Sequence, residues 1–143
     1  NNGLPPFLAM KPGIECGLMI AQYTAASIVS ENKVLAHPSC VDSIPTSGNQ
    51  EDHVSMGTTS ARQVRQITHN AAKVIAIECI CASQAIYLEK CENLLAPKTK
   101  QFLETVRTYC PPLTTDQPIG DEIEALAHYL LTSNELLILA NAE

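Results

Sequence analysis

Residues 61–95 read ARQVRQITHNAAKVIAIECICASQAIYLEKCENLL, and this stretch decides the fold. It contains no glycine or proline, and its apolar residues recur at steps of three and four, as in a helix with one buried face. At about 1.5 Å per residue such a helix is a rod of about 50 Å, longer than a compact domain of 143 residues normally accommodates. We therefore expect an all-α fold, a bundle of long helices in which this rod belongs to a larger assembly.

Shorter helical segments lie on both sides of the rod. Before it, residues 14–29 carry apolar side chains at helical spacing, and His37-Pro38 closes the pattern because proline disfavours helix at the residue before it. The hydroxyl residues 58–60 are candidate caps for the rod, and Pro97 is expected to end it. No strand alternation is visible. We expect further helices at 98–109, 120–131 and 133–140.

The composition limits the partners of the chain. Its formal net charge is −6, and its nine lysines and arginines are spread along the sequence, so we expect no nucleic-acid partner. The two richest apolar windows, 14–29 and 74–88, are each interrupted by a glutamate and a glutamine. Neither offers the ~20 uninterrupted apolar residues that a membrane span requires. An apolar fraction of 45% suffices for a globular core, so we expect a globular protein with no membrane partner.

The six cysteines admit a disulfide framework of the kind found in secreted proteins. The sequence has no charged-then-apolar leader, however, so we expect a reduced, cytoplasmic setting in which the cysteines are small buried hydrophobic residues. Cys79 and Cys81 lie two apart in a helical pattern and therefore face different sides, which makes a poor metal pair. His69 and His128 have no second ligand at a metal-binding spacing. The sequence therefore predicts no metal site.

A polar interval, SIPTSGNQEDHVSMG at residues 43–57, separates the first helix from the rod. One proline, two glycines and many short polar side chains interrupt any regular period, so this interval is expected to be an irregular loop. Polar side chains on a connection between rigid elements are typical of binding and catalytic sites. Asp52 and Ser55 are expected to cap backbone N–H groups of the loop. From composition alone, Glu51 is a solvated acid and Met19 a core residue.

Four segments in this loop and its flanks are similar to segments of a known protein family. GLMIAQ at 17–22, SENK at 30–33, SIPTS at 43–47 and NQEDHVSMG at 49–57 are together similar to the carboxy-terminal half of the histidine ammonia-lyases, members of the aromatic amino-acid lyase family. The match is close from about residue 3 to residue 62 and weaker, with a consistent helical layout, to the end. The resemblance implies the histidine/phenylalanine ammonia-lyase (fumarase-like) fold, in which all-helical homotetramers bundle long helices around shared active sites.

The resemblance also implies a chemistry. The family removes ammonia from L-histidine to give urocanate, using methylidene-imidazolone, an electrophile formed from an internal Ala-Ser-Gly when the Gly nitrogen attacks the Ala carbonyl and water is lost. This sequence has no Ala-Ser-Gly, and the nearest tripeptide, Thr46-Ser47-Gly48, carries a branched residue at the attacked position. The resemblance therefore places the cofactor, together with the family's catalytic tyrosine and histidine, outside this chain. Residues 1–143 are expected to be the carboxy-terminal portion of a lyase without its amino-terminal part, inactive alone.

Individual roles follow from the same resemblance. Glu51 matches the family's active-site glutamate, and a carboxylate suits both substrate recognition and proton handling. Asn49 and Gln50 are expected to shape the substrate pocket, although their amides would equally suit pinning the loop to backbone groups. Met19 matches the position that lines the pocket for the substrate side chain. His53 is expected to support the loop.

Several functions remain open on the sequence. The run Gln50 to His53 favours histidine as substrate, because phenylalanine and tyrosine ammonia-lyases tend to carry Gln-Asp after the Asn. A 2,3-aminomutase uses the same cofactor and differs in the fate of the ammonia. A non-catalytic helical scaffold is the alternative of another class, supported by the missing Ala-Ser-Gly. Exposed apolar helix faces are expected to require partner copies, so we expect a homo-oligomer, a tetramer by the resemblance.

Overall fold

The computed structural model describes residues 3–134. Over that range the chain forms helices joined by turns and loops, and it contains no β-strand, only two isolated bridges. The all-α prediction is confirmed; the helix predicted at 133–140 falls almost entirely outside the described residues. The elements in order are a 3-10 turn Pro6–Leu8, α1 Met19–Leu35, a 3-10 turn Ser47–Asn49, α2 Gly57–Glu89, a 3-10 turn Glu92–Leu94, α3 Pro97–Tyr109 and α4 Gly120–Thr132.

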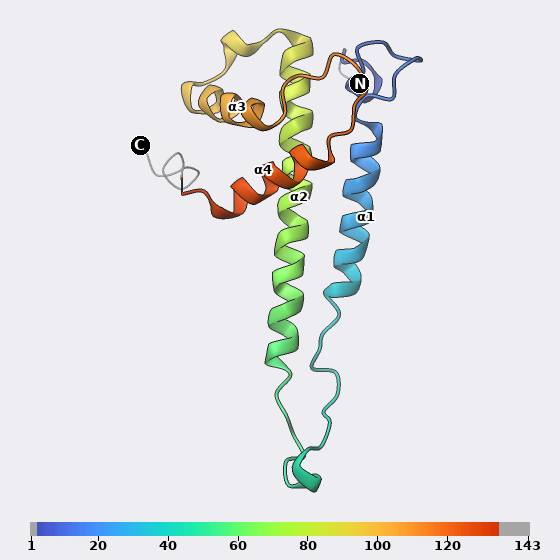
Figure 1. Ribbon diagram of the computed structural model, residues 1–143, viewed down its shortest axis with the longest axis vertical. Coiled ribbons are helices and arrows are strands. Elements are labelled where there is room, and N and C mark those ends of the chain that lie inside the picture. Colours follow the sequence, from blue (N-terminus) through green and yellow to red (C-terminus); the bar gives the residue numbers. More distant parts are fainter. Residues whose placement is uncertain (1–2, 135–143) are drawn as a thin grey trace.

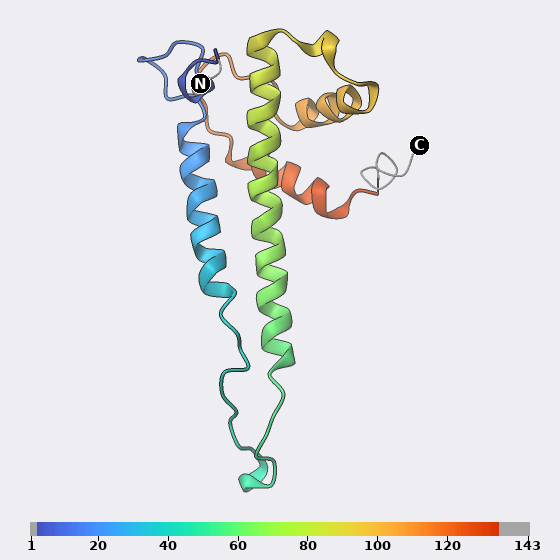
Figure 2. The same ribbon diagram turned by 180° about the vertical axis from the view of Figure 1, so that it is seen from behind.

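The long helix α2 is the axis of the molecule (Figure 1). Helix α1 runs beside it in the opposite direction, and the loop between them extends beyond both helices as a narrow arm (Figures 1 and 2). Helix α3 lies beside the carboxy-terminal part of α2, at the end remote from that arm, whereas α4 crosses near the middle of α2, where Lys73 pairs with Glu124 (Figure 1). At 33 residues, α2 has a length of about 50 Å, so the predicted rod is confirmed.

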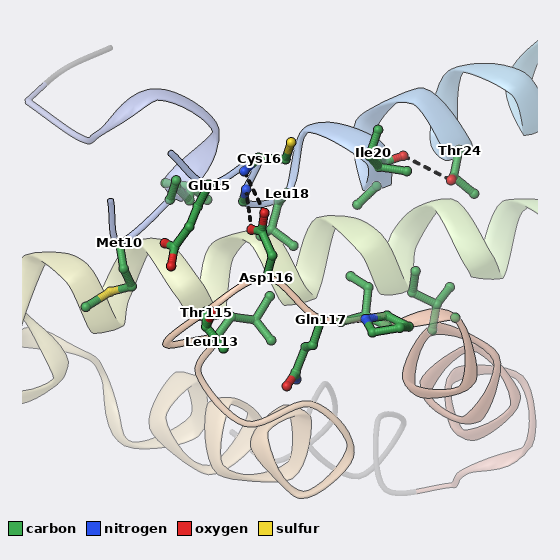
Figure 3. Close-up of a pocket in the computed structure, with 18 residues that line it drawn as sticks. Met10, Glu15, Cys16, Leu18, Ile20, Thr24, Leu113, Thr115, Asp116 and Gln117 are labelled. Carbon is green, nitrogen blue, oxygen red and sulfur yellow. Dashed lines mark hydrogen bonds between the residues drawn. The ribbon is translucent and has the colours of Figure 1, made fainter. Parts of the chain in front are cut away.

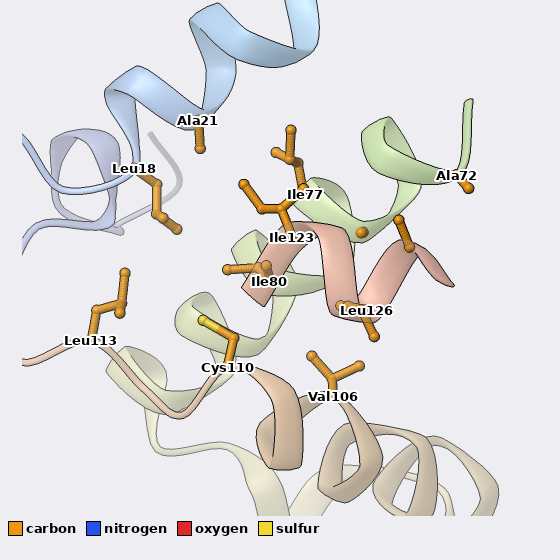
Figure 4. Close-up of a cluster of buried hydrophobic side chains, with 12 residues drawn as sticks. Leu18, Ala21, Ala72, Ile77, Ile80, Val106, Cys110, Leu113, Ile123 and Leu126 are labelled. Atoms are coloured by element: carbon orange, nitrogen blue, oxygen red, sulfur yellow. The ribbon is translucent and has the colours of Figure 1, made fainter. Parts of the chain in front are cut away.

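The hydrophobic core sits where α2 meets the other three helices (Figure 4). Leu126 of α4 is 0% exposed and Val106 of α3 is 2% exposed, and both belong to the same buried cluster as Ile77 and Ile80 of α2. Small side chains let the helices approach closely. The buried alanines of this cluster are Ala21, Ala72, Ala76 and Ala127. The first buried residue of α2 is Asn70, so its amino-terminal third takes no part in the core.

Helix α1 begins at Met19, so the prediction of a helix from Ile14 is wrong for its first turn. Gly17 adopts a left-handed φ of 54°, and a Cβ added there would lie 2.5 Å from the carbonyl oxygen of Phe7. The carboxylate of Asp116 accepts hydrogen bonds from the N–H groups of Cys16, at 2.8 Å, and Gly17, at 2.9 Å. These contacts hold the chain out of helix, and Ile14 is 85% exposed.

Both ends of α2 differ from the sequence prediction. The helix ends at Glu89 because Lys90 turns into the left-handed region at φ 54°. Pro97 does not end α2; it opens α3, where the missing N–H of proline costs no helical hydrogen bond. At the other end the capping position is Met56, with no side-chain cap, so the predicted hydroxyl cap at 58–60 is wrong.

Side-chain exposure separates the cysteines. All six are free thiols; Cys110 is buried, whereas Cys16 and Cys40 are exposed, so the expectation that the cysteines are buried is wrong for these two. Burial, with a smaller contribution from Glu122, raises the pKa of the Cys110 thiol to about 11. Burial also raises the pKa values of Cys79 and Cys81, and neighbouring Glu78 adds to both shifts.

Large apolar side chains remain exposed along the α1 and α2 pair. Ile20 is 60%, Tyr23 is 64% and Val34 is 74% exposed on α1, while Val64 on α2 is 60% exposed. By length and composition α2 could cross a membrane, although core helices of water-soluble proteins meet the same measure. Helices with this much uncovered apolar surface normally pack against further protein.

Candidate functional site

The loop between α1 and α2 is the candidate site, and its two limbs are joined by polar contacts. Ser43 donates its hydroxyl hydrogen to the carbonyl oxygen of Asp52, at 3.3 Å, and accepts the N–H of Val54, at 2.9 Å. Ser55 accepts the N–H of Gly57 at 3.3 Å, as predicted, whereas Asp52 contributes its carbonyl rather than a capping carboxylate. The loop is irregular, as predicted, but internally hydrogen-bonded.

Two further polar clusters join the start of the loop and α1 to α2. At its base the Ser39 hydroxyl lies 2.7 Å from the Ser60 hydroxyl and donates to Oε1 of Gln63 at 3.0 Å. Deeper between α1 and α2, the Asn70 amide donates to Oε2 of Glu31 and to Oδ1 of Asn32, both at 2.9 Å. Asn70 is only 3% exposed, and its own oxygen accepts from Gln66, so this buried amide is fully paired. These clusters fix the direction in which the arm leaves the helices.

The tip of the arm is a tight turn between Thr46 and Glu51. Thr46 donates its N–H to the Glu51 carbonyl at 2.9 Å, and Glu51 returns an N–H to the Thr46 carbonyl at 3.3 Å. Between them Ser47, Gly48 and Asn49 all have left-handed φ values, 53°, 64° and 69°. A left-handed residue other than glycine costs about 1–2 kcal/mol, and strain of this kind clusters at functional sites.

At this tip, the side chain of Glu51 is held by a hydrogen bond. Its Oε2 accepts a hydrogen bond of 2.7 Å from the Thr46 hydroxyl. Within residues 3–134 its Oε1 receives no hydrogen bond, and the residue is exposed. Asn49 and Gln50, also exposed, precede it on the turn. The structure thus brings three of the four predicted site residues together, with one carboxylate oxygen free to accept a donor.

The fourth predicted residue, Met19, lies elsewhere. It is the first residue of α1, whereas the loop follows the last, and 17 residues of helix separate the ends by about 25 Å. Met19 is half-buried and lines a shallow hollow of about 260 Å³ with Phe7, Pro12 and Ile14. Within one copy of the chain, Met19 and Glu51 therefore cannot contact the same small molecule.

A larger cavity of about 580 Å³ lies at the same end as Met19, between the start of α1 and the segment that joins α3 to α4 (Figure 3). Its walls are mainly apolar. The carboxylates of Glu15 and Asp116 line it, but Glu15 accepts the N–H of Lys11 and Asp116 accepts those of Cys16 and Gly17. Because these acids are committed to backbone groups, the cavity is a poor candidate for acid–base chemistry.

Sequence reasoning missed Ser43 and Thr46, the two hydroxyl residues that organise the loop. Both lie within the SIPTS segment that carries the resemblance, but their partners, Val54 and Glu51, lie across the turn. The expectation for His53, loop support, receives no direct test: its side chain is exposed.

Two observations concern a metal ion and the precursor of the family's cofactor. Among residues 3–134 no group of three or more His, Cys, Asp or Glu side chains could hold a metal ion. Thr46-Ser47-Gly48, the tripeptide nearest to Ala-Ser-Gly, does not fit cyclisation, because the Thr46 carbonyl pairs with the Glu51 N–H and Thr46 is branched at Cβ.

Known proteins similar to this chain agree on one family. The sequence profile described as "Aromatic amino acid lyase" matches residues 1–108. Histidine ammonia-lyase of Geobacillus kaustophilus is 55% identical over 130 residues, which cover 91% of this chain and 26% of that protein. Histidine ammonia-lyase of Staphylococcus aureus is 54% identical over 93% of this chain and 26% of its own length. The chain thus spans about a quarter of these relatives.

Solved structures share the fold. Histidine ammonia-lyase from Trypanosoma cruzi is 39% identical, with a TM-score of 0.85 over 96% of this chain and 27% of that one. Tyrosine aminomutase from Streptomyces globisporus is 35% identical, with a TM-score of 0.91 over 99% of this chain and 27% of that one. These matches confirm the fold inferred from the resemblance. The family profile, which covers most of the chain, and the agreement of all four relatives show that the chain belongs to the aromatic amino acid lyase family.

Proposed function

We propose that this chain is the carboxy-terminal portion of a histidine ammonia-lyase, which eliminates ammonia from L-histidine to give urocanate. The observation that carries the proposal is Glu51: an exposed carboxylate on a strained, hydrogen-bonded turn, with one oxygen held and the other free. It contributes nothing to the hydrophobic core. The 55% identity to a histidine ammonia-lyase and the run Gln50 to His53 support histidine as the substrate.

Glu51 is the proposed catalytic residue. Its free oxygen can accept a hydrogen bond from the ammonium or imidazole N–H of histidine and can take up a proton during elimination. Asn49 and Gln50 would shape the pocket beside it, because their amides supply donors and acceptors without charge. Met19 is proposed to line the pocket for the substrate side chain.

The separation between Met19 and Glu51 supports a homo-oligomer. In a single copy Met19 begins α1 and Glu51 lies in the loop beyond the other end of α1, so a pocket containing both requires Met19 of one copy to meet Glu51 of another. The exposed apolar residues along α1 and α2 provide surface for such packing. We propose the tetramer that the family resemblance implies.

The electrophile is proposed to come from outside this chain, as methylidene-imidazolone made from an Ala-Ser-Gly in the amino-terminal part of the protein. It would supply the electron sink for the elimination, and no metal is required. The chain alone is proposed to be inactive. The whole protein is proposed to be cytoplasmic, with no nucleic-acid or membrane partner.

The test is turnover by the full-length protein. Histidine is supplied, urocanate formation is followed by its ultraviolet absorbance, and phenylalanine and tyrosine serve as control substrates. We expect urocanate from histidine and negligible product from the other two. Turnover of tyrosine alone would overturn the substrate assignment, and absence of activity with all three would favour a non-catalytic scaffold.

A 2,3-aminomutase is the second candidate, because a tyrosine aminomutase shares the fold at a TM-score of 0.91. The two functions differ in product. A mutase returns the amino group to the neighbouring carbon and yields a β-amino acid, whereas a lyase releases free ammonia. Chromatographic analysis of the products with tyrosine as substrate distinguishes them, and we expect no β-amino acid.

A further inference from the structure

We infer that Thr46 is a positioning residue for Glu51, and that its hydroxyl holds the carboxylate in the orientation that substrate requires. This inference rests on the proposed function, since it deepens the role given there to Glu51. Thr46 is the first residue of Thr46-Ser47-Gly48, the tripeptide nearest to Ala-Ser-Gly. Its hydroxyl bonds the carboxylate of Glu51, five positions later.

The hydrogen bonds of the loop separate the role of the Thr46 hydroxyl from closure of the turn. Two backbone hydrogen bonds already close the turn between Thr46 and Glu51, at 2.9 and 3.3 Å. Ser43 independently joins the two limbs through the Asp52 carbonyl and the Val54 N–H. The bond from Thr46 Oγ1 to Glu51 Oε2 at 2.7 Å is therefore not needed to close the loop. Its specific effect is on the direction of the Glu51 side chain.

An exposed glutamate would otherwise sample many rotamers. A glutamate side chain has three rotatable bonds, and fixing it in one geometry costs up to about 2 kcal/mol of conformational entropy. The Thr46 hydroxyl restricts the carboxylate before substrate arrives, and preorganisation of this kind lowers the free energy needed to reach the reactive geometry. Because a threonine hydroxyl carries a single hydrogen, donation to Oε2 also leaves Oε1 as the acceptor presented outward.

Threonine is well suited to orient the Glu51 carboxylate. Thr46 has an extended backbone, with φ −127° and ψ 176°, a conformation that β-branched residues favour. Its χ1 angle is restricted by that branching, so the hydroxyl is itself held in place. Serine at this position would keep the donor with a freer χ1 angle, and valine would keep the shape without the donor.

These differences define the experiment in the full-length protein. We expect Thr46→Val to lower kcat/KM for histidine by about 10-fold to 100-fold, the range for loss of a hydrogen bond to a charged group. Thr46→Ser should stay within about threefold of the unchanged protein, and all melting temperatures should agree. Thr105→Val, in which the lost hydroxyl bonds only the Gln101 carbonyl on remote α3, is the matched control and should have unchanged activity.

A double-mutant cycle with Glu51→Ala separates orientation of Glu51 from general loop support. With enzyme in excess so that slow turnover is measurable, Thr46→Val should have no further effect once Glu51 is gone. A persistent loss in that background, or equal losses in the Ser and Val variants, would overturn the role of Thr46. An unchanged Thr46→Val alongside an impaired Glu51→Ala would overturn this inference and leave the proposed function standing. Full activity in Glu51→Ala would instead defeat the assignment of Glu51 itself.

Discussion

Different interactions hold the two ends of α2: apolar packing at one end and polar hydrogen bonds at the other. At the packed end, which comprises residues 70–89 with α3, α4 and the start of α1, apolar side chains close around Leu126 and Val106. At the other end, residues 36–69, which comprise the arm and the first turns of α2, no residue is buried, and the chain is held by hydroxyl, amide and carboxylate hydrogen bonds. Stability should therefore depend on the packed end, whereas the proposed catalytic role of Glu51 depends on the other end.

Replacing Leu126 by alanine should break the packed end. The side chain is 0% exposed, and removing it leaves a cavity among α2, α3 and α4, which costs about 2–5 kcal/mol. Chemical denaturation of the full-length protein measures the loss. Lys100→Ala, at an exposed polar position on α3, should change stability by less than about 0.5 kcal/mol. Similar losses in the two variants would mean that the core is not where the structure places it.

Gly17→Ala should disturb the junction between the packed end and α1. The new Cβ would lie 2.5 Å from the Phe7 carbonyl oxygen, and the φ of 54° disfavours any side chain. We expect a loss of about 2 kcal/mol or more in the free energy of unfolding. Gly120→Ala is the control, because no atom lies within 4 Å of the Cβ that would be added there. Equal stability of the two variants would contradict the observed approach of Gly17 to the Phe7 carbonyl.

Asn70→Ala tests the boundary between the two ends. The change removes the buried amide that joins α2 to Glu31 and Asn32, but both partners are accessible to water, so we expect a loss of about 1–2 kcal/mol. Hydrogen exchange of the α1 amides should rise near Asn32 and stay unchanged near Ala21. Exchange that rises equally at both places would show that the arm and the core do not unfold separately.

A pH dependence confined to the alkaline range is expected at Cys110. Burial raises the pKa of this thiol from its ordinary 9.0 to about 11, so its contribution to stability is fully present below pH 9 and is lost as the pH rises through 11. Cys110→Ala should make the alkaline loss of stability shallower in denaturation experiments across that range. Cys40→Ala, at an exposed thiol, should leave the pH dependence as it was.

Local patterns predicted the helices well and their limits poorly. The absence of glycine and proline from 61–95 predicted α2, and the turn residues of 43–57 predicted an irregular loop. The start of α1 could not be predicted, because it depends on Asp116, about a hundred residues away. The end of α2 depends on one left-handed residue, Lys90, for which the sequence carries no glycine signal.

For the candidate site, too, the residues could be predicted from the sequence but the contacts between them could not. The resemblance predicted Asn49, Gln50 and Glu51 as site residues; the structure places all three on one exposed turn, and their roles stay predictions. It could not show that Thr46 holds Glu51, because that bond depends on three successive left-handed residues at the tip. Nor did it show that Met19 lies at the far end of α1. The distance between two elements, such as the start of α1 and the loop, can be read only from the folded structure.

The most direct test of the separation between the ends is Glu51→Gln in the full-length protein, with kcat and melting temperature measured on the same preparation. The amide keeps the size of the side chain and removes its charge and its capacity to take up a proton. We expect kcat for histidine to fall by about 10²-fold or more, the range for loss of a general acid–base group, while the melting temperature is unchanged. Unchanged kcat, or a fall that accompanies a large drop in melting temperature, would contradict the separation between the two ends.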